Sequence, residues 1–135
     1  MTLAVVDASV LAVFYLSDDP RRDDVVARLA GGDALYAPAH LDAEVVSALR
    51  GLARVSRTVE RVAPAALRHL AGLPIRRMPL APLLERMWEL RANVTPYVAA
   101  YVALAEQLDA PVITCDTKLA LAAASGTRCA FDLIS

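Results

Sequence analysis

The chain has 135 residues, of which 57% are hydrophobic, enough to fill the core of one domain. Its 14 basic and 15 acidic side chains give a formal net charge of −1, so bulk charge does not draw it to nucleic acid. No apolar run reaches the roughly 20 residues of a membrane-spanning helix, and the N-terminal segment lacks the basic start of a signal peptide. We therefore expect a single cytoplasmic domain over residues 1–135, with no membrane association.

The first half of the chain alternates short apolar strands with helices. Residues 3–6 form a continuous apolar run that ends in Asp-Ala-Ser, as expected for a buried parallel strand followed by a helix start. Pro38 is expected to begin a helix, and Pro64 to begin, kink or interrupt one. A second strand is predicted at 35–37, and helices are predicted at 8–16, 21–30, 38–54 and 58–71.

The second half continues this alternation. Thr95 followed by Pro96 predicts a helix start, because Thr suits the N-cap and Pro the first helical position. Further strands are predicted at 75–78, 111–114 and 129–133, and helices at 83–90, 96–108 and 116–124. Strands that alternate with helices predict an α/β fold with a central, mostly parallel sheet of four to five short strands and helices on both faces.

The cysteines and histidines show no metal or disulfide pattern. Cys115 and Cys129 form no CxxC motif, and we expect both to be buried free thiols. His40 and His69 have no partners at the spacing of zinc ligands. A zinc site is therefore not expected.

Two acids directly follow predicted strands, Asp7 after the first and Asp116 after residues 111–114. Each alone is better explained as an N-cap of the next helix. In open parallel sheets, however, ligands bind beyond the carboxyl ends of the strands, so two acids there favour a shared site. Converging carboxylates repel one another, and Mg²⁺ or Mn²⁺ would remove that repulsion.

Glu44 is a third candidate. It lies where the apolar face of the predicted helix 38–54 meets its polar face. The pattern alone fits a solvated residue and an acid directed into a cleft equally well. The inward stripe of this helix consists of Leu41, Val45, Ala48 and Leu52.

Four segments carry a family resemblance when they are taken in order. They are residues 5–9 (VVDAS), 38–45 (PAHLDAEV), 95–97 (TPY) with 99–106 (AAYVALAE), and 112–116 (VITCD). Each is weak alone, but the ordered set, which runs the length of the chain, resembles a PIN-domain protein. The closest resemblance is to the VapC-type toxins of bacterial toxin–antitoxin pairs.

This resemblance implies a PIN-like three-layer α/β/α fold and Mg²⁺-dependent endoribonuclease activity, with acids that hold one or two Mg²⁺ (or Mn²⁺) ions. By position, Asp7 would be the central ligand, Glu44 would bind or orient a second metal or the attacking water, and Asp116 would complete the first site. Thr114 would help to orient water or phosphate. The resemblance also implies an RNA substrate, a homodimer and a VapB-type antitoxin that buries the cleft.

Position 98 departs from the family pattern, which implies a fourth metal-binding acid, usually Asp, where this chain has Val98. The residues themselves place Val98 in an ordinary inward stripe with Val102. Asp42 and Glu106 are not placed to substitute for the missing acid. We therefore expect impaired metal binding and activity, with Val98 either introduced or natural. The alternative is a degenerate PIN-fold module that dimerises and binds an antitoxin without cleaving RNA.

Four arginines, at positions 50, 54, 57 and 61, would line one face of a continuous helix. A solvated face is the simpler interpretation. The functional alternative is a basic rim for RNA phosphates or an acidic antitoxin segment, with Arg50 and Arg54 as candidate contacts.

Overall fold

The computed structural model describes residues 2–123 and 126–135. Its centre is a five-stranded sheet in the order β3-β2-β1-β4-β5, and each neighbouring pair of strands is parallel. This confirms the predicted α/β fold with a parallel sheet. The strands are β1 (Leu3–Val6), β2 (Ala34–Pro38), β3 (Ile75–Met78), β4 (Val112–Thr114) and β5 (Phe131–Leu133).

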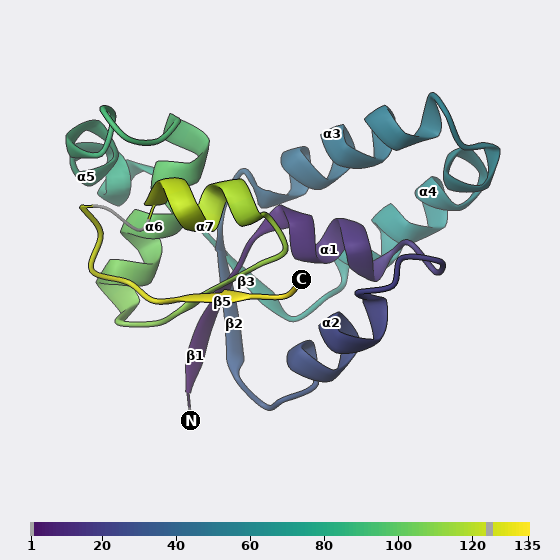
Figure 1. Ribbon diagram of the computed structural model, residues 1–135, viewed down its shortest axis with the longest axis horizontal. Helices are drawn as coiled ribbons and strands as arrows, with labels where there is room; N and C mark the ends of the chain where they lie inside the picture. Colours follow the sequence, from purple (N-terminus) through teal and green to yellow (C-terminus); the bar gives the residue numbers. More distant parts are fainter. Residues whose placement is uncertain (1, 124–125) are drawn as a thin grey trace.

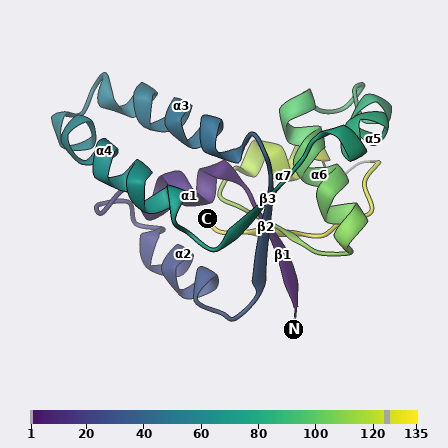
Figure 2. The ribbon, with the colours of Figure 1, turned by 180° about the vertical axis from the view of Figure 1, so that it is seen from behind.

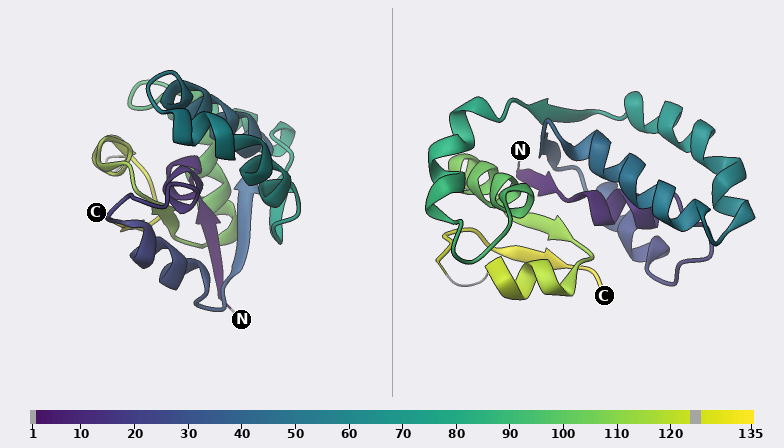
Figure 3. Two further views of the ribbon diagram at one scale, coloured as in Figure 1. Left: turned by 90° about the vertical axis from the view of Figure 1, so that its right-hand side faces the viewer. Right: turned by 90° about the horizontal axis from the view of Figure 1, so that it is seen from above.

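Helices cover both faces of this sheet, as Figure 3 shows for α1 and α2 on one side and α5 and α6 on the other. This follows from right-handed crossovers, because the chain steps outward from β1 to β3 in one direction and from β4 to β5 in the other. The helices are α1 (Ala8–Phe14), α2 (Arg22–Leu29), α3 (Leu41–Ala53), α4 (Arg57–Ala71), α5 (Leu84–Glu89), α6 (Pro96–Leu108) and α7 (Thr117–Ala123), with a 3-10 turn η1 (Ala81–Leu83) before α5.

The helices α3 and α4 pack against each other as a hairpin that projects beyond the sheet (Figure 1). The edge strand β3 then carries the chain from the end of α4 towards α5, as seen from behind (Figure 2). Seen this way, the chain divides into a sheet with its covering helices and a projecting helical hairpin.

The central strand β1 is buried from Ala4 to Val6, which explains its unbroken apolar sequence. Ala4, Val5 and Val6 have no exposed surface. Because β1 lies between β2 and β4, its carboxyl end is the point at which the order of the sheet reverses. This is where open parallel sheets place their ligands. This buried part of β1 therefore leads directly to Asp7.

The prediction for Pro38 is wrong, and at Pro64 the helix neither begins nor is interrupted. Pro38 does not begin a helix; it is the last residue of β2, in register with Met78 of β3, and α3 begins only at Leu41. A proline at a strand end is tolerated where no ladder hydrogen bond is needed. Pro64 lies inside α4, which is continuous around it and begins at Arg57 after the N-cap Ser56. Its missing N–H deprives only one carbonyl of a partner, that of the exposed residue Glu60.

Other predicted boundaries agree with the structure to within a few residues. The Thr95 side chain accepts a hydrogen bond from the Val98 N–H at 3.3 Å, so Thr95 caps α6 as expected. The predicted helix 116–124 is α7, and its last predicted residue, Ala124, lies outside the described residues. Cys115 is a buried free thiol, whereas Cys129 is only half-buried. None of the described helices is long and apolar enough to span a bilayer.

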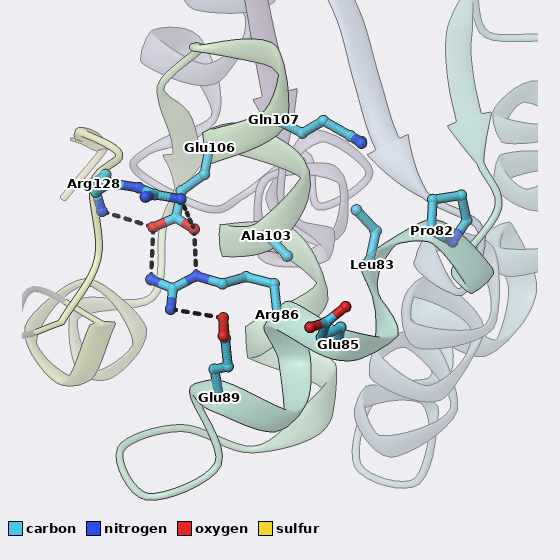
Figure 4. Close-up of a pocket in the computed structure, with 9 residues that line it drawn as sticks. All are labelled: Pro82, Leu83, Glu85, Arg86, Glu89, Ala103, Glu106, Gln107 and Arg128. Carbon is cyan, nitrogen blue, oxygen red and sulfur yellow. Dashed lines mark hydrogen bonds and ion pairs between the residues drawn. The ribbon is translucent and has the colours of Figure 1, made fainter.

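A buried ion pair connects α5, α6 and the segment after α7 (Figure 4). The Glu106 side chain, 3% exposed, accepts hydrogen bonds from Nε and Nη2 of Arg86 at 2.7 and 3.1 Å, and from the Arg128 N–H at 2.8 Å. Arg86 also donates to the Gly126 carbonyl at 2.9 Å. An adjoining pocket of about 330 Å³ exposes part of this network. Because its carboxylate is fully engaged, Glu106 is a structural residue, as expected from its position.

Replacing Glu106 with Gln should destabilise the fold by about 2 kcal/mol, because the amide loses the charge-assisted hydrogen bonds from Arg86. Arg86 holds the pKa of Glu106 below its ordinary value of 4.5. The stabilisation is therefore fully present above pH 4.5 and is lost as the pH falls through the lower pKa of the folded state. Urea unfolding at neutral and acid pH checks both statements.

The matched control is Glu85→Gln, since Glu85 lines the same pocket but is exposed. Equal urea midpoints for the two variants at neutral pH would contradict the assignment.

Candidate active site at the carboxyl ends of the strands

Asp7 does not act as a helix cap, although it occupies the N-cap position of α1. Its side chain makes no capping hydrogen bond. Instead, Oδ2 accepts hydrogen bonds from the hydroxyls of Ser9, at 2.6 Å, and Thr114, at 2.9 Å. The capping interpretation is therefore wrong for Asp7, and the side chain is available to a site.

The environment of Asp7 is unfavourable for a carboxylate. The residue is only 5% exposed. Burial raises its pKa above the ordinary value, the nearby Glu44 carboxylate raises it further, and the Ser9 and Thr114 hydrogen bonds oppose this only in part. A buried acid whose surroundings disfavour its ionised form is typical of functional sites.

The two hydroxyls that hold Asp7 are themselves fixed by the backbone. Ser9 Oγ accepts a hydrogen bond from the Cys115 N–H and Thr114 Oγ1 accepts one from the Asp116 N–H, each at 3.0 Å. Thr114 was predicted as a supporting residue, and the structure places it against Asp7. Sequence reasoning gave Ser9 no role, although its position two residues after the strand-end Asp7 is a usable signal. Together these contacts join the ends of β1 and β4.

Glu44 lies on the first turn of α3 and is directed towards the same region. Its Oε1 accepts a hydrogen bond from the Tyr101 hydroxyl at 2.7 Å, and His40 Nε2 lies 3.2 Å away. Burial alone would raise the pKa of Glu44, but His40 and Tyr101 together hold it below its ordinary value. Of the two readings that the pattern allowed, the structure favours the acid directed inward.

Tyr101 donates its hydroxyl hydrogen bond to Glu44, and sequence reasoning missed it. The residue is almost completely buried in the middle of α6. Burial raises its hydroxyl pKa, and the Asp7 and Glu44 carboxylates raise it further, so the hydroxyl stays protonated and remains a hydrogen-bond donor. An apolar helix gave no sign of this role.

Asp116, in contrast, is a helix cap. Its Oδ1 accepts hydrogen bonds from the backbone N–H groups of Lys118 and Leu119, at 3.0 and 3.2 Å, at the start of α7. The residue is exposed, and it connects to Asp7 only through its own N–H and the Thr114 hydroxyl.

The metal that these acids were predicted to hold can be tested against their arrangement. Within residues 2–123 and 126–135, no three His, Cys, Asp or Glu side chains are grouped closely enough to hold an ion. The carboxylate oxygens of Asp7 and Glu44 are the donors that Mg²⁺ prefers. The donor chemistry therefore fits, but too few donors converge, and the metal-binding role of Asp7, Glu44 and Asp116 stays a prediction.

Val98 is an apolar packing residue. It is half-buried on α6 and packs against a small hydrophobic cluster that joins α5, α6 and α7, formed by Leu90, Ala99, Val102 and Ala123. This confirms the interpretation of Val98 as part of an inward stripe. At this position the side chain supplies no ligand.

The four arginines do not share one helix face. Arg50 lies on α3 and Arg54 directly after it, whereas Arg57 and Arg61 lie on α4, which runs back along α3. The condition for a shared face is therefore not met, and all four side chains are exposed, as the simpler interpretation expects. Arg50 and Arg54 are exposed, and in the described part of the chain neither forms an ion pair.

Comparison with known proteins agrees with this geometry. The model of the PIN domain family matches residues 4–125. Ribonuclease VapC9 of Mycobacterium tuberculosis is 38% identical over 117 residues, which cover 87% of this chain and 88% of that protein. The chain therefore belongs to the PIN-domain family and, within it, to the VapC-type toxins.

Solved structures show the same fold at lower identity. The crystal structure of VapC20 of Mycobacterium tuberculosis, a sarcin–ricin-loop cleaving toxin, matches with a TM-score of 0.69 at 20% identity, over 93% of this chain and 96% of that chain. VapBC2 from Rickettsia felis, bound to promoter DNA, matches with a TM-score of 0.68 at 11% identity, over 99% of this chain and 100% of that chain. The three-layer α/β/α architecture expected from the sequence is confirmed.

Replacing Asp7 with Asn should raise the free energy of unfolding by about 1 kcal/mol at neutral pH, because the amide removes a buried charge. The sign follows from the raised pKa: above the folded-state pKa the ionised Asp7 destabilises the fold, and below the ordinary value of 3.8 it does not. Urea unfolding in EDTA measures the change.

Asp116→Asn is the matched control and should leave stability unchanged, since Asn caps helices about as well as Asp. A loss of stability in Asp7→Asn relative to this control would show that Asp7 is a structural residue.

Proposed function

We propose that this chain is a Mg²⁺-dependent endoribonuclease toxin of a toxin–antitoxin pair, impaired as written because Val98 replaces a metal-binding acid. The observation that carries the proposal is the Asp7 carboxylate, buried against the Ser9 and Thr114 hydroxyls and coupled to Glu44 instead of capping α1. Burial disfavours the ionised form of this carboxylate, because it raises the pKa. Relatives such as VapC9 are named ribonucleases, which supports an RNA substrate.

Asp7, Glu44 and Asp116 would hold the Mg²⁺ or Mn²⁺ ion, which when bound would neutralise charge on the phosphodiester and activate water. The chain's own residues prepare this site. Ser9 and Thr114 fix the direction of the Asp7 carboxylate, while Tyr101 and His40 fix that of Glu44. Thr114 would also orient water or phosphate. Such fixed orientation is what catalytic groups require.

The proposed partner is a VapB-type antitoxin. The neighbouring VapBC2 structure, which shares the fold, supports this partner. Arg50 and Arg54, exposed beside the projecting hairpin, are candidate contacts for the antitoxin or for RNA phosphates. The homodimer and the cytoplasmic location stay predictions.

Val98→Asp should raise Mg²⁺- or Mn²⁺-dependent cleavage of structured RNA by about tenfold or more, since it restores an oxygen ligand. An acid is also well placed in the first turn of α6, where it suits the helix dipole. Cleavage is compared with that of the double variant Val98→Asp, Asp7→Asn, which keeps the new acid but lacks the central one. If the single variant cleaves no faster than the double variant, the nuclease proposal fails for this chain.

A second candidate is a PIN-fold module that dimerises and binds an antitoxin without cleaving RNA. It is favoured by the lack of a three-ligand group among the described residues and by the apolar packing of Val98. Calorimetry on the unaltered protein separates the two candidates. The module should bind a VapB-type antitoxin tightly and show no heat of Mg²⁺ binding. Saturable Mg²⁺ binding would favour the nuclease.

A further inference from the structure

A pocket of about 330 Å³ opens directly beside Glu44. Its wall is formed by the start of α3 and the first turn of α6, and its lining residues are His40, Ala43, Glu44, Ser47 and Tyr97. Of these residues, Glu44 is a proposed metal ligand and His40 lies against it, whereas the other three have no role in the proposed chemistry. We infer that this pocket binds one unpaired RNA base next to the acidic site, with Tyr97 as the stacking surface. The inference rests on the proposed function, since it names the form of RNA that this site accepts.

Tyr97 supplies an aromatic surface that the fold does not use. The residue is 63% exposed, although it lies next to a half-buried cluster of rings. Its ring centroid lies 6.0 Å from that of His40, and the two rings are tilted by 54°. Aromatic rings exposed beside a pocket are the usual stacking surfaces for unpaired bases, because every base offers a flat face.

His40 forms a second aromatic wall of the pocket. Both of its ring nitrogens are buried and make no hydrogen bond, although Nε2 lies 3.2 Å from Glu44 Oε1. The part of the ring that lines the pocket is therefore carbon. Behind it lies the buried Tyr101 ring, edge-on at 5.2 Å. His40 thus contributes ring carbons to the pocket lining and packs against Tyr101.

The remaining lining suits the edge of a base and the strand that carries it. Ser47 is exposed and offers a hydroxyl that both donates and accepts. Arg50 and Arg54 follow Ser47 along α3 by about one and two turns, both exposed, where phosphates of the same strand would pass. The volume of this pocket is at the small end of the range for ligand sites, so it admits one base. That base must be unstacked, and duplex RNA does not offer unstacked bases.

The test measures binding of a fluorescent single-stranded RNA that carries 2-aminopurine, in EDTA so that no cleavage occurs. Tyr97→Ala should weaken binding about tenfold and abolish the quenching of 2-aminopurine by stacking. Tyr97→Phe should bind normally, because stacking needs the ring and not the hydroxyl. Ser47→Ala should weaken binding by a smaller factor. The matched control is Trp88→Ala, which removes a 67% exposed ring on α5 that does not line the pocket.

Three results would overturn the inference: no measurable binding by the unaltered protein, equal affinity for fully paired RNA, or equal losses in Tyr97→Ala and Trp88→Ala. The readout needs neither metal nor cleavage. An inactive Val98→Asp variant would therefore count against the proposed function alone. Equal losses of binding in Tyr97→Ala and Trp88→Ala would count against the base pocket alone.

Discussion

The site depends on one arrangement, the pair of hydroxyl hydrogen bonds that Ser9 and Thr114 donate to the buried Asp7 carboxylate. A carboxylate that is 5% exposed is tolerated only where polar groups surround it. Each hydroxyl also accepts a backbone N–H from the segment after β4. The same atoms therefore orient the acid and join the two central strands where the sheet order reverses. Loss of either hydroxyl would affect both functions together.

The position of Asp7 could be predicted from the sequence, but its role could not. An unbroken apolar run of strand length places the next residue at the carboxyl end of a buried strand. At that position an N-cap and a metal ligand require the same residue type, and only the direction of the side chain distinguishes them. Asp116 makes this plain, because it follows a similar strand and does cap its helix. The sequence treated the two acids alike, whereas the structure separates them.

Sequence reasoning missed the role of Tyr101 because its partner lies far away along the chain. Tyr101 and Glu44 are 57 positions apart, and no periodicity connects them. The prediction that Pro38 begins a helix was wrong for a related reason. Proline suits the first turn of a helix and the end of a strand equally well, and the pairing of β2 with β3 decides between the two. Local patterns were sufficient for the elements and insufficient for contacts between them.

Two other acids, Asp42 and Glu106, already pair with arginines. Neither carboxylate is therefore free to take the place of the acid expected at position 98. Asp42 pairs with Arg77 at 2.9 Å, and Glu106 pairs with Arg86. Both carboxylates hold helices in place, so moving either towards Asp7 would leave a partly buried guanidinium without its partner. Val98, for its part, adds apolar contacts between α5, α6 and α7. The residue that we propose to replace a metal ligand therefore supports the fold through its apolar contacts.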